Sequence, residues 1–241
     1  MISHPSKNTN KLEQELTFSK TEAFAKWLDC SDNDLKDLFY GELLPGIRAF
    51  KFTLNSKKLT EMINSLQNAP FYIRVYMGAN PNAVFGTSGE QPAFKPFTQA
   101  YNSGNLPPDM EQNSYFFEYV PVELSEIHGN VQQIPRDTAM LLVQNWLDVD
   151  DDKIKYTLNS PEGRLRFYSF GIEDTSSIKR VFEHIKPGDA VLNLYLGCYP
   201  PDSNGDQIFT FRTILQITNG TGISPNEDAW FEFSNPCPPL C

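Results

Sequence analysis

Four acidic residues recur as two matched pairs along the chain, and they are the first candidates for chemistry. Asp29 and Asp148 each end a Trp-Leu-Asp triplet, while Glu118 and Glu232 each lie in an aromatic segment. Two carboxylates that face one another perturb each other's pKa and can perform acid–base or hydrolytic chemistry. Such chemistry requires that one pair approach within about 10 Å at a pocket. The alternative is that each pair performs one structural task twice.

Matched basic and aromatic residues are candidates for ligand binding. Arg48 and Arg166 each precede an aromatic strand pattern, and Tyr76 and Tyr195 lie in the similar segments "IRVYMGANP" and "LNLYLGCYP". An Arg–Glu bridge within each half is the structural alternative for the charged members.

A long segment rich in Asn, Gly and Pro, residues 79–114, is a second candidate binding region. It carries the aromatic residues Phe85, Phe94, Phe97 and Tyr101. Long loops in compact domains are often functional. Two interpretations stay open, because these rings could form a binding surface or could pin the loop to the core.

Established catalytic motifs are absent from the sequence. It contains no G-x-G-x-x-G, Walker A, H-E-x-x-H, G-x-S-x-G or C-x-x-C pattern. Histidine, the commonest general acid–base group, occurs only at His4, His128 and His184. Ser–His and Cys–His catalysis are therefore poorly supported.

Neither a metal site nor a cofactor is expected. The run from Asp148 to Asp152 begins like a calcium loop, but Lys153 and Asn159 occupy the positions that need Gly and Glu. We interpret this run, and the similar segment 29–34, as helix caps. Cys237 and Cys241 form a C-x3-C pair in a tail that we expect to be frayed and reduced, and Cys30 and Cys198 read as small buried residues.

Several segments recur at nearly constant spacing, which predicts an internal duplication. Trp27 and Trp146 are 119 residues apart, as are Tyr76 and Tyr195. The segment 48–52 matches 166–170 at a spacing of 118, and 116–119 matches 230–233 at 114.

The elements that position these residues also repeat. Each half reads as a helix ending at Trp-Leu-Asp, a helical turn, a strand (47–54; 165–172), an amphipathic helix, a second strand (71–78; 190–197), a long loop or hairpin and a final strand (115–120; 229–233). Ser56 is expected to cap the first amphipathic helix, and one of residues 174–176 the second. Residues 207–217 predict a further strand in the second half. The corresponding segment of the first half, 93–101, contains Pro96, which would confine a strand there to a sheet edge or break it.

We predict an α+β fold of two similar repeats with mixed sheets, packed as an intrachain pseudo-dimer. Strand–helix–strand order favours a right-handed parallel crossover with helices on one face of the sheet. The expected division is a flexible segment 1–18, a first repeat 19–121, a connector 122–136, a second repeat 137–234 and a tail 235–241. Separate, bead-like domains are the alternative.

Composition excludes several classes of function. The net charge of -10 opposes binding to nucleic acid, and no run of about 18 apolar residues predicts a membrane span. The first twenty residues lack the apolar core of a secretory signal, so we expect a cytoplasmic protein.

Three functions remain open. We prefer a non-catalytic module that binds a protein partner or a small ligand. The alternatives are a hydrolase using paired carboxylates between the repeats, and an acidic inhibitor of a basic protein. Oligomeric state is left open.

Overall fold

The structure, a computed structural model, describes residues 18–66, 70–85, 89–102, 110–122, 134–160, 162–184, 189–200, 209–219, 229–231 and 234–237. His4, His128, Glu232 and Cys241 lie outside these ranges, as does the side chain of His184.

The first half begins with two short helical elements and one amphipathic helix. Helix α1 (Lys20–Asp29) starts in a capping box made by Ser19 and Glu22, and a 3-10 helix, η1 (Leu35–Phe39), follows it. Helix α2 (Ser56–Asn64) is capped by Asn55, whose side chain accepts from the backbone of Lys58. The predicted cap, Ser56, is therefore the first residue of the helix.

The described part of the second half contains three further helices. These are α4 (Ile134–Asp148), α5 (Ile154–Leu158) and α6 (Ile172–His184). Helix α4 begins inside the segment predicted as a connector. Helix α6 already includes residues 174–176, so the expected caps lie two to four residues after the first residue of the helix.

Two five-stranded sheets form the body of the molecule. Sheet A has the order β11-β10-β9-β1-β5, and sheet B has the order β12-β8-β2-β3-β4. In the first half the strands are β1 (Lys51–Leu54), β2 (Phe71–Tyr76), β3 (Phe97–Asn102), β4 (Ser114–Phe116) and β5 (Glu118–Tyr119). In the second half they are β8 (Phe167–Phe170), β9 (Ala190–Tyr199), β10 (Thr210–Asn219), β11 (Ala229–Phe231) and β12 (Ser234–Cys237), and a small hairpin joins β6 (Asn159–Ser160) to β7 (Gly163–Arg164).

Each sheet contains strands from both halves of the chain. In sheet A, β1 pairs with β9, placing Lys51 opposite Tyr195, and in sheet B, β8 pairs with β2, placing Phe167 opposite Tyr76. The strands before and after α2 thus lie in different sheets, as do those before and after α6. The predicted parallel crossover is wrong, and every strand pair in the described part of the chain is antiparallel. The α+β class is confirmed, but the mixed sheets are not.

Two segments differ from their predicted roles, because one expected at a sheet edge lies inside a sheet and one expected as a single strand is split in two. Strand β3 starts directly after Pro96 and lies between β2 and β4, so it is not an edge strand. The predicted strand 115–120 divides at Phe117, with β4 in sheet B and β5 in sheet A. Strand β10 confirms the strand expected over 207–217. Strand β12 extends into the segment predicted as a frayed tail, where Cys237 pairs with Phe167.

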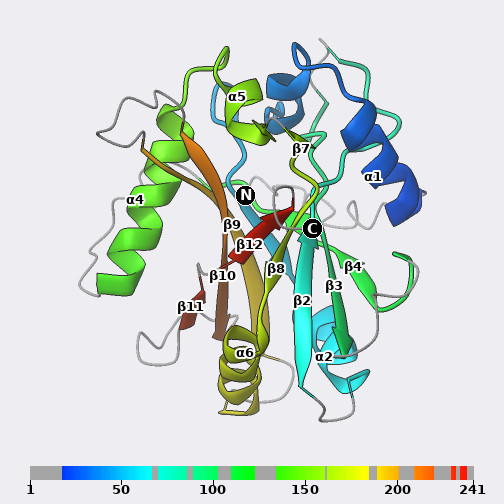
Figure 1. Cartoon of the computed structure of the whole chain (residues 1–241), viewed down its shortest axis with the longest axis vertical. Coiled ribbons are helices and arrows are strands. Elements are labelled where there is room, and N and C mark those ends of the chain that lie inside the picture. Colours follow the sequence, from blue (N-terminus) through cyan, green and yellow to red (C-terminus); the bar gives the residue numbers. More distant parts are fainter. Residues whose placement is uncertain are drawn as a thin grey trace, which may run out of the picture.

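The two sheets enclose one hydrophobic core. Side chains from both contribute to it, including Phe52, Leu54, Leu192 and Leu194 from sheet A and Ile73, Val75, Tyr168 and Phe170 from sheet B. Helix α2 contacts β9 as well as β3 and β4, and α6 contacts β2 as well as β10 and β11, so each helix touches both sheets. In Figure 1 the long strands run alongside one another, with α4 outside sheet A, α1 outside sheet B, and α2 and α6 together at one end.

Two glycines lie where another part of the chain approaches a strand closely. A Cβ on Gly78 would lie 2.3 Å from the carbonyl oxygen of Lys95 and 3.5 Å from Cβ of Ala23 on α1. A Cβ on Gly197 would lie 3.0 Å from Cβ of Leu142 on α4. The glycine of the repeated Tyr-x-Gly pattern therefore leaves room for the Lys95 backbone in the first half and for helix α4 in the second. Among the described helices, none combines the length and apolar character that crossing a membrane requires.

Candidate functional site

Arg48 is buried and joins the first half to the end of α4. Its side chain is 4% exposed, and it donates to the backbone carbonyl of Trp146, to that of Val149 at 2.6 Å and to a carboxylate oxygen of Asp151 at 2.9 Å. The last carbonyls of a helix have no partner within the helix, and the guanidinium satisfies them here. These contacts occupy the side chain that the sequence offered for ligand binding.

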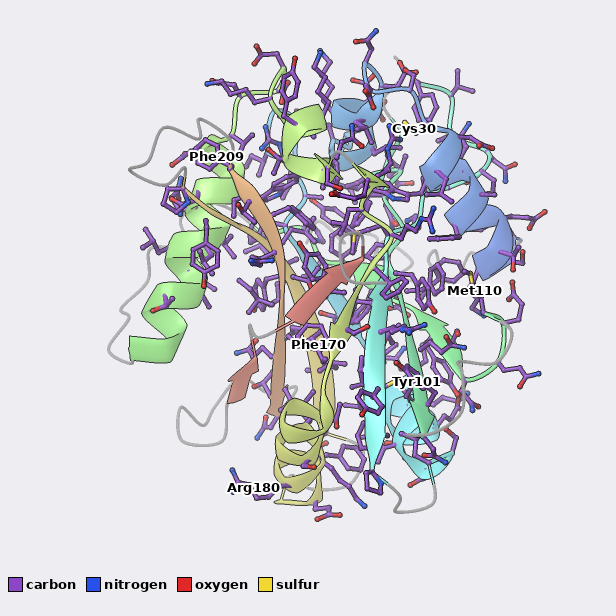
Figure 2. The ribbon with its side chains drawn as sticks, in the orientation of Figure 1. Cys30, Tyr101, Met110, Phe170, Arg180 and Phe209 are labelled. Carbon is purple, nitrogen blue, oxygen red and sulfur yellow. The ribbon has the colours of Figure 1, made fainter. Side chains whose placement is uncertain are left out.

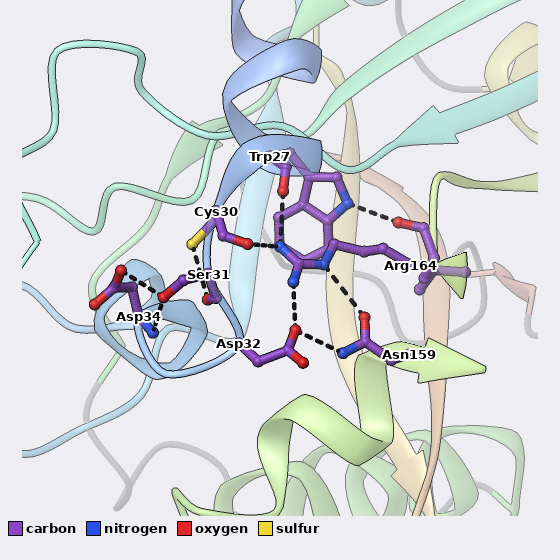
Figure 3. A network of polar contacts seen from close by, with 8 residues as sticks. Trp27, Cys30, Ser31, Asp32, Asp34, Asn159 and Arg164 are labelled. Atoms are coloured by element: carbon purple, nitrogen blue, oxygen red, sulfur yellow. Dashed lines mark hydrogen bonds and ion pairs between the residues drawn. The ribbon is translucent and has the colours of Figure 1, made fainter. Parts of the chain in front are cut away.

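Arg164, in the second half, makes the corresponding contacts with the end of α1 in the first half. It donates to the carbonyls of Trp27 at 3.0 Å and Cys30 at 2.5 Å, and it pairs with Asp32 at 2.6 Å (Figure 3). Asn159 also donates to Asp32, at 3.0 Å, just as Tyr40 donates to Asp151 at 2.8 Å.

The indoles complete this pattern. Trp27 donates to the carbonyl of Leu165 at 2.6 Å, and Trp146 donates to that of Ala49 at 3.0 Å. We refer to the two sets around Arg48 and Arg164 as the arginine clasps. The sequence comparison paired Arg48 with Arg166, but Arg166 is exposed and Arg164 holds the matching contacts.

The acidic runs contribute to the clasps rather than to helix caps. Neither η1 nor α5 has a side-chain cap hydrogen bond, whereas Asp32 and Asp151 each accept from an arginine. The expectation of helix capping is therefore wrong for these two residues. Their carboxylates stabilise the buried guanidinium groups instead.

The structure gives the candidate carboxylates separate surroundings. Asp29 and Asp148 are exposed and end α1 and α4, which cover different sheets. Asp148 accepts from Gln144 at 2.8 Å, and Glu118 pairs with Lys58 at 2.8 Å on the exterior. Glu232 lies outside the described residues. Within the described part of the chain, no group of three or more His, Cys, Asp or Glu side chains is arranged to hold a metal ion.

Tyr76 and Tyr195 have equivalent buried partners. The Tyr76 hydroxyl hydrogen-bonds to the side-chain oxygen of Gln99 at 3.1 Å, and that of Tyr195 to Gln216 at 3.1 Å. Both tyrosines are under 10% exposed, at 3% and 7%. Tyr76 also contacts Phe24 of α1, and both hydroxyls are engaged inside the protein instead of being free for a ligand.

Two of the four candidate rings of the segment 79–114 are packed in the interior. Phe94 and Phe97 have no exposed surface, and Phe94 contacts Trp27, Phe39 and Phe52. Phe85 is half-buried, with the Lys26 ammonium 4.5 Å from its ring centre. Tyr101 differs, because it lies on the outer side of sheet B.

On the outer face of sheet A, the central polar side chains hydrogen-bond to one another. Asn193 lies on the central strand, opposite Gln216 on one side and Thr53 on the other. Its amide donates to Gln216 at 2.9 Å, and its amide oxygen accepts from Thr53 at 2.7 Å. Both ends of the side chain are therefore satisfied.

On the outer face of sheet B, an arginine flanked by aromatic rings occupies the position that Asn193 has in sheet A. Arg74 lies on the central strand, opposite Gln99 and Ser169. Its guanidinium carbon is 4.5 Å from the ring centre of Phe167 and 5.1 Å from that of Tyr101. Tyr101 stacks on Tyr72 with ring centres 5.5 Å apart. We define Tyr72, Arg74, Tyr101 and Phe167, all half-buried, as the Arg74 face.

Helix α1 covers only one end of this row of aromatic side chains. Ala23 packs with Tyr76, Phe97 and Phe116, and Phe24 contacts Tyr76. The Arg74 face continues from this covered end, and in Figure 2 Tyr101 lies well below α1.

The positive charge of Arg74 is not paired with a carboxylate in the described part of the chain. Among the described residues no carboxylate oxygen lies within 4 Å of Arg74, and its buried Nε has no hydrogen-bond partner there. Burial raises the pKa of the Tyr101 phenol, and the adjacent Arg74 charge opposes that shift. The face therefore combines a cation with stacked rings.

Sequence reasoning identified Tyr101 but missed Tyr72, Arg74 and Phe167. The signal was present, because the segment "YIRVY" at 72–76 aligns with "VLNLY" at 191–195 and differs in charge at its centre. Comparison with protein-family models, curated proteins and solved structures gave no match.

Proposed function

We propose that the protein is a non-catalytic interaction module that binds a protein partner through the Arg74 face. The observation that carries this proposal is the contrast between the two sheets at one place. Asn193 is fully hydrogen-bonded within sheet A, whereas Arg74 lies between rings with no acidic partner among the described residues. Aromatic and arginine side chains are the types that dominate binding energy at protein interfaces.

The form of the face favours an extended partner. Small ligands prefer concave sites that bury most of their surface. The Arg74 face instead spreads over three adjacent strands, β8, β2 and β3. A peptide segment or a protein surface can cover such an area.

We also propose that the fold arose by internal duplication, with the two repeats packed as an intrachain pseudo-dimer. The arginine clasps support this origin, since Arg48 and Arg164 each bind the helix end of the opposite half. Two backbone bonds add support. Leu196 donates to Phe50 at 2.9 Å, and Met77 donates to Arg166 at 2.9 Å.

A cytoplasmic location and a partner other than nucleic acid complete the proposal. Cys30 and Cys198 are free, buried thiols, which is typical of proteins in a reducing compartment. The net charge of -10 opposes a nucleic-acid partner.

Peptide-display selection with matched variants tests the binding function. The wild-type protein, a Tyr72→Ser/Tyr101→Ser variant and a Val191→Ser/Thr218→Ser variant are used as bait. The second pair faces each other on sheet A as Tyr72 and Tyr101 do on sheet B. We expect enriched peptides to bind the wild type and the sheet A variant but not the sheet B variant. Equal binding to all three folded proteins would reject the Arg74 face as the interaction surface.

A further inference from the structure

The chemistry of the Arg74 face specifies one kind of partner. We infer that it binds a peptide segment in which a carboxylate-bearing side chain lies next to aromatic or large apolar side chains. This inference rests on the proposed function and adds the identity of the recognised group.

The guanidinium is oriented by rings from both neighbouring strands. Phe167 on β8 and Tyr101 on β3 flank Arg74 on β2, at 4.5 and 5.1 Å from the guanidinium carbon. Aromatic contacts of this kind use the faces of the planar group. The guanidinium also hydrogen-bonds the side chain of Tyr101, but its five N–H donors exceed what this one bond uses. A carboxylate matches the N–H edges of a guanidinium with two parallel hydrogen bonds.

The neighbouring polar groups do not supply that carboxylate. Gln99 and Ser169, the residues directly opposite Arg74, are neutral. In the described part of the chain the guanidinium has no ion pair, unlike Arg48 and Arg164, which each bind an aspartate. Charge complementarity therefore favours an anionic partner group at this position, despite the acidity of the whole protein.

The stacked tyrosines supply the apolar part of the site. Tyr72 and Tyr101 are stacked with an angle of 18° between their planes, and both are half-buried. Aromatic side chains offer a large contact area at low entropic cost. A partner ring or aliphatic group that packs there would bring an adjacent carboxylate to Arg74.

Two probe peptides isolate the contribution of the charge. The first is acetyl-Phe-Glu-Phe-amide, and the second replaces its Glu by Gln, which keeps the shape and removes the anion. Each is titrated into the full-length, isotope-labelled protein while backbone amide NMR signals are followed. We expect the Glu peptide to shift signals of β2, β3 and β8 and to bind about 10-fold more tightly than the Gln peptide.

Variants test whether Arg74 is responsible. Arg74→Gln is expected to abolish the preference for Glu, and Arg74→Lys to retain only part of it, because lysine cannot form the bidentate contact. Arg166→Gln changes the net charge equally at an exposed position and should keep the full preference. Thermal melts of each variant confirm that the proteins compared are folded.

Several outcomes would overturn the inference. Equal affinity for both peptides, with a loss only in Tyr72→Ser/Tyr101→Ser, would mean that the face binds apolar groups without recognising charge; the proposed function would then survive. If no signal of β2, β3 or β8 shifts, a carboxylate-bearing peptide is rejected as the occupant of the face. It is also rejected if these signals shift with protein concentration alone, and that result would indicate that another copy of the chain binds there. The proposed function itself is decided separately by the display selection.

Discussion

Arg74 and Asn193 occupy the same place in the two sheets, each at the centre of its sheet and opposite a buried glutamine. Asn193 is joined to Gln216 and Thr53 by hydrogen bonds, whereas Arg74 is flanked by aromatic rings. The outer face of sheet A thus carries a hydrogen-bonded polar network, whereas the outer face of sheet B carries a cation beside stacked rings. This difference is the basis for assigning binding to sheet B.

The arginine clasps should be major and comparable sources of stability. Removing either guanidinium leaves helix carbonyls without their donor and an aspartate without its counterion, so Arg48→Gln and Arg164→Gln should each lower the free energy of unfolding by about 3 kcal/mol. Arg166→Gln, at an exposed site, should change it by less than about 0.5 kcal/mol. Urea unfolding at neutral pH measures all three. A loss at Arg166 as large as that at Arg164 would contradict the assignment.

Gly78 should tolerate no side chain. In Gly78→Ala the new Cβ would overlap the carbonyl of Lys95, at 2.3 Å, so we expect a loss of about 3 kcal/mol. Gly171→Ala is the matched control, since no atom lies within 4 Å of the position that its Cβ would take. Thermal melts compare the two variants. Similar melting temperatures would show that the Lys95 carbonyl does not lie against Gly78 as described.

Lys95 should give a pH-dependent stability change. It is 9% exposed, it donates to Gln91 at 3.1 Å, and burial lowers its pKa below the ordinary value of 10.5. The unfolded chain therefore holds this proton more tightly, and the resulting cost to stability is present below the lowered folded-state pKa and disappears as the pH rises past 10.5.

Lys95→Met removes that cost, because methionine retains the apolar stem without the charge. We expect the variant to be more stable than the wild type by about 1 kcal/mol at pH 7, with the difference shrinking above about pH 10. Lys36→Met, at an exposed position, serves as the control. Destabilisation by Lys95→Met at pH 7 would mean that the ammonium makes a net favourable contact.

The two buried thiols should be unreactive in the folded protein. Burial raises the pKa of Cys30 to about 11 and also raises that of Cys198, and both are 4% exposed or less. Because the thiolate is the reactive form, iodoacetamide at pH 8 should label neither site until the protein is unfolded in urea. Peptide mass spectrometry distinguishes these cysteines from Cys237 and Cys241. Rapid native labelling of Cys198 would contradict its place in the core.

The sequence predicted the element types better than their pairing. The apolar stripe of Leu59, Met62 and Ile63 identified α2, and all three are buried. A strand–helix–strand pattern, however, has the same periodicity whether its strands join one sheet or two. Local hydrophobicity therefore could not show that β1 and β2 lie in different sheets.

The mistaken pairing of Arg48 with Arg166 has a similar cause. Side chains alternate along a strand with a period of two, so a shift of two residues keeps every side chain on its own face. Aromatic alternation thus fits both Arg164 and Arg166. Only the contacts across the two halves, such as Leu165 with Trp27, distinguish them.

Backbone NMR contacts between strands test the central claim most directly, because the comparison of Arg74 with Asn193 depends on how the strands pair. Interstrand nuclear Overhauser effects should link Lys51 with Tyr195 and Phe167 with Tyr76, joining each half to the other in both sheets. If β1 instead shows contacts to β2 and none to β9, each half has its own sheet. The equivalence of the two faces, and the binding function assigned from it, would then be wrong.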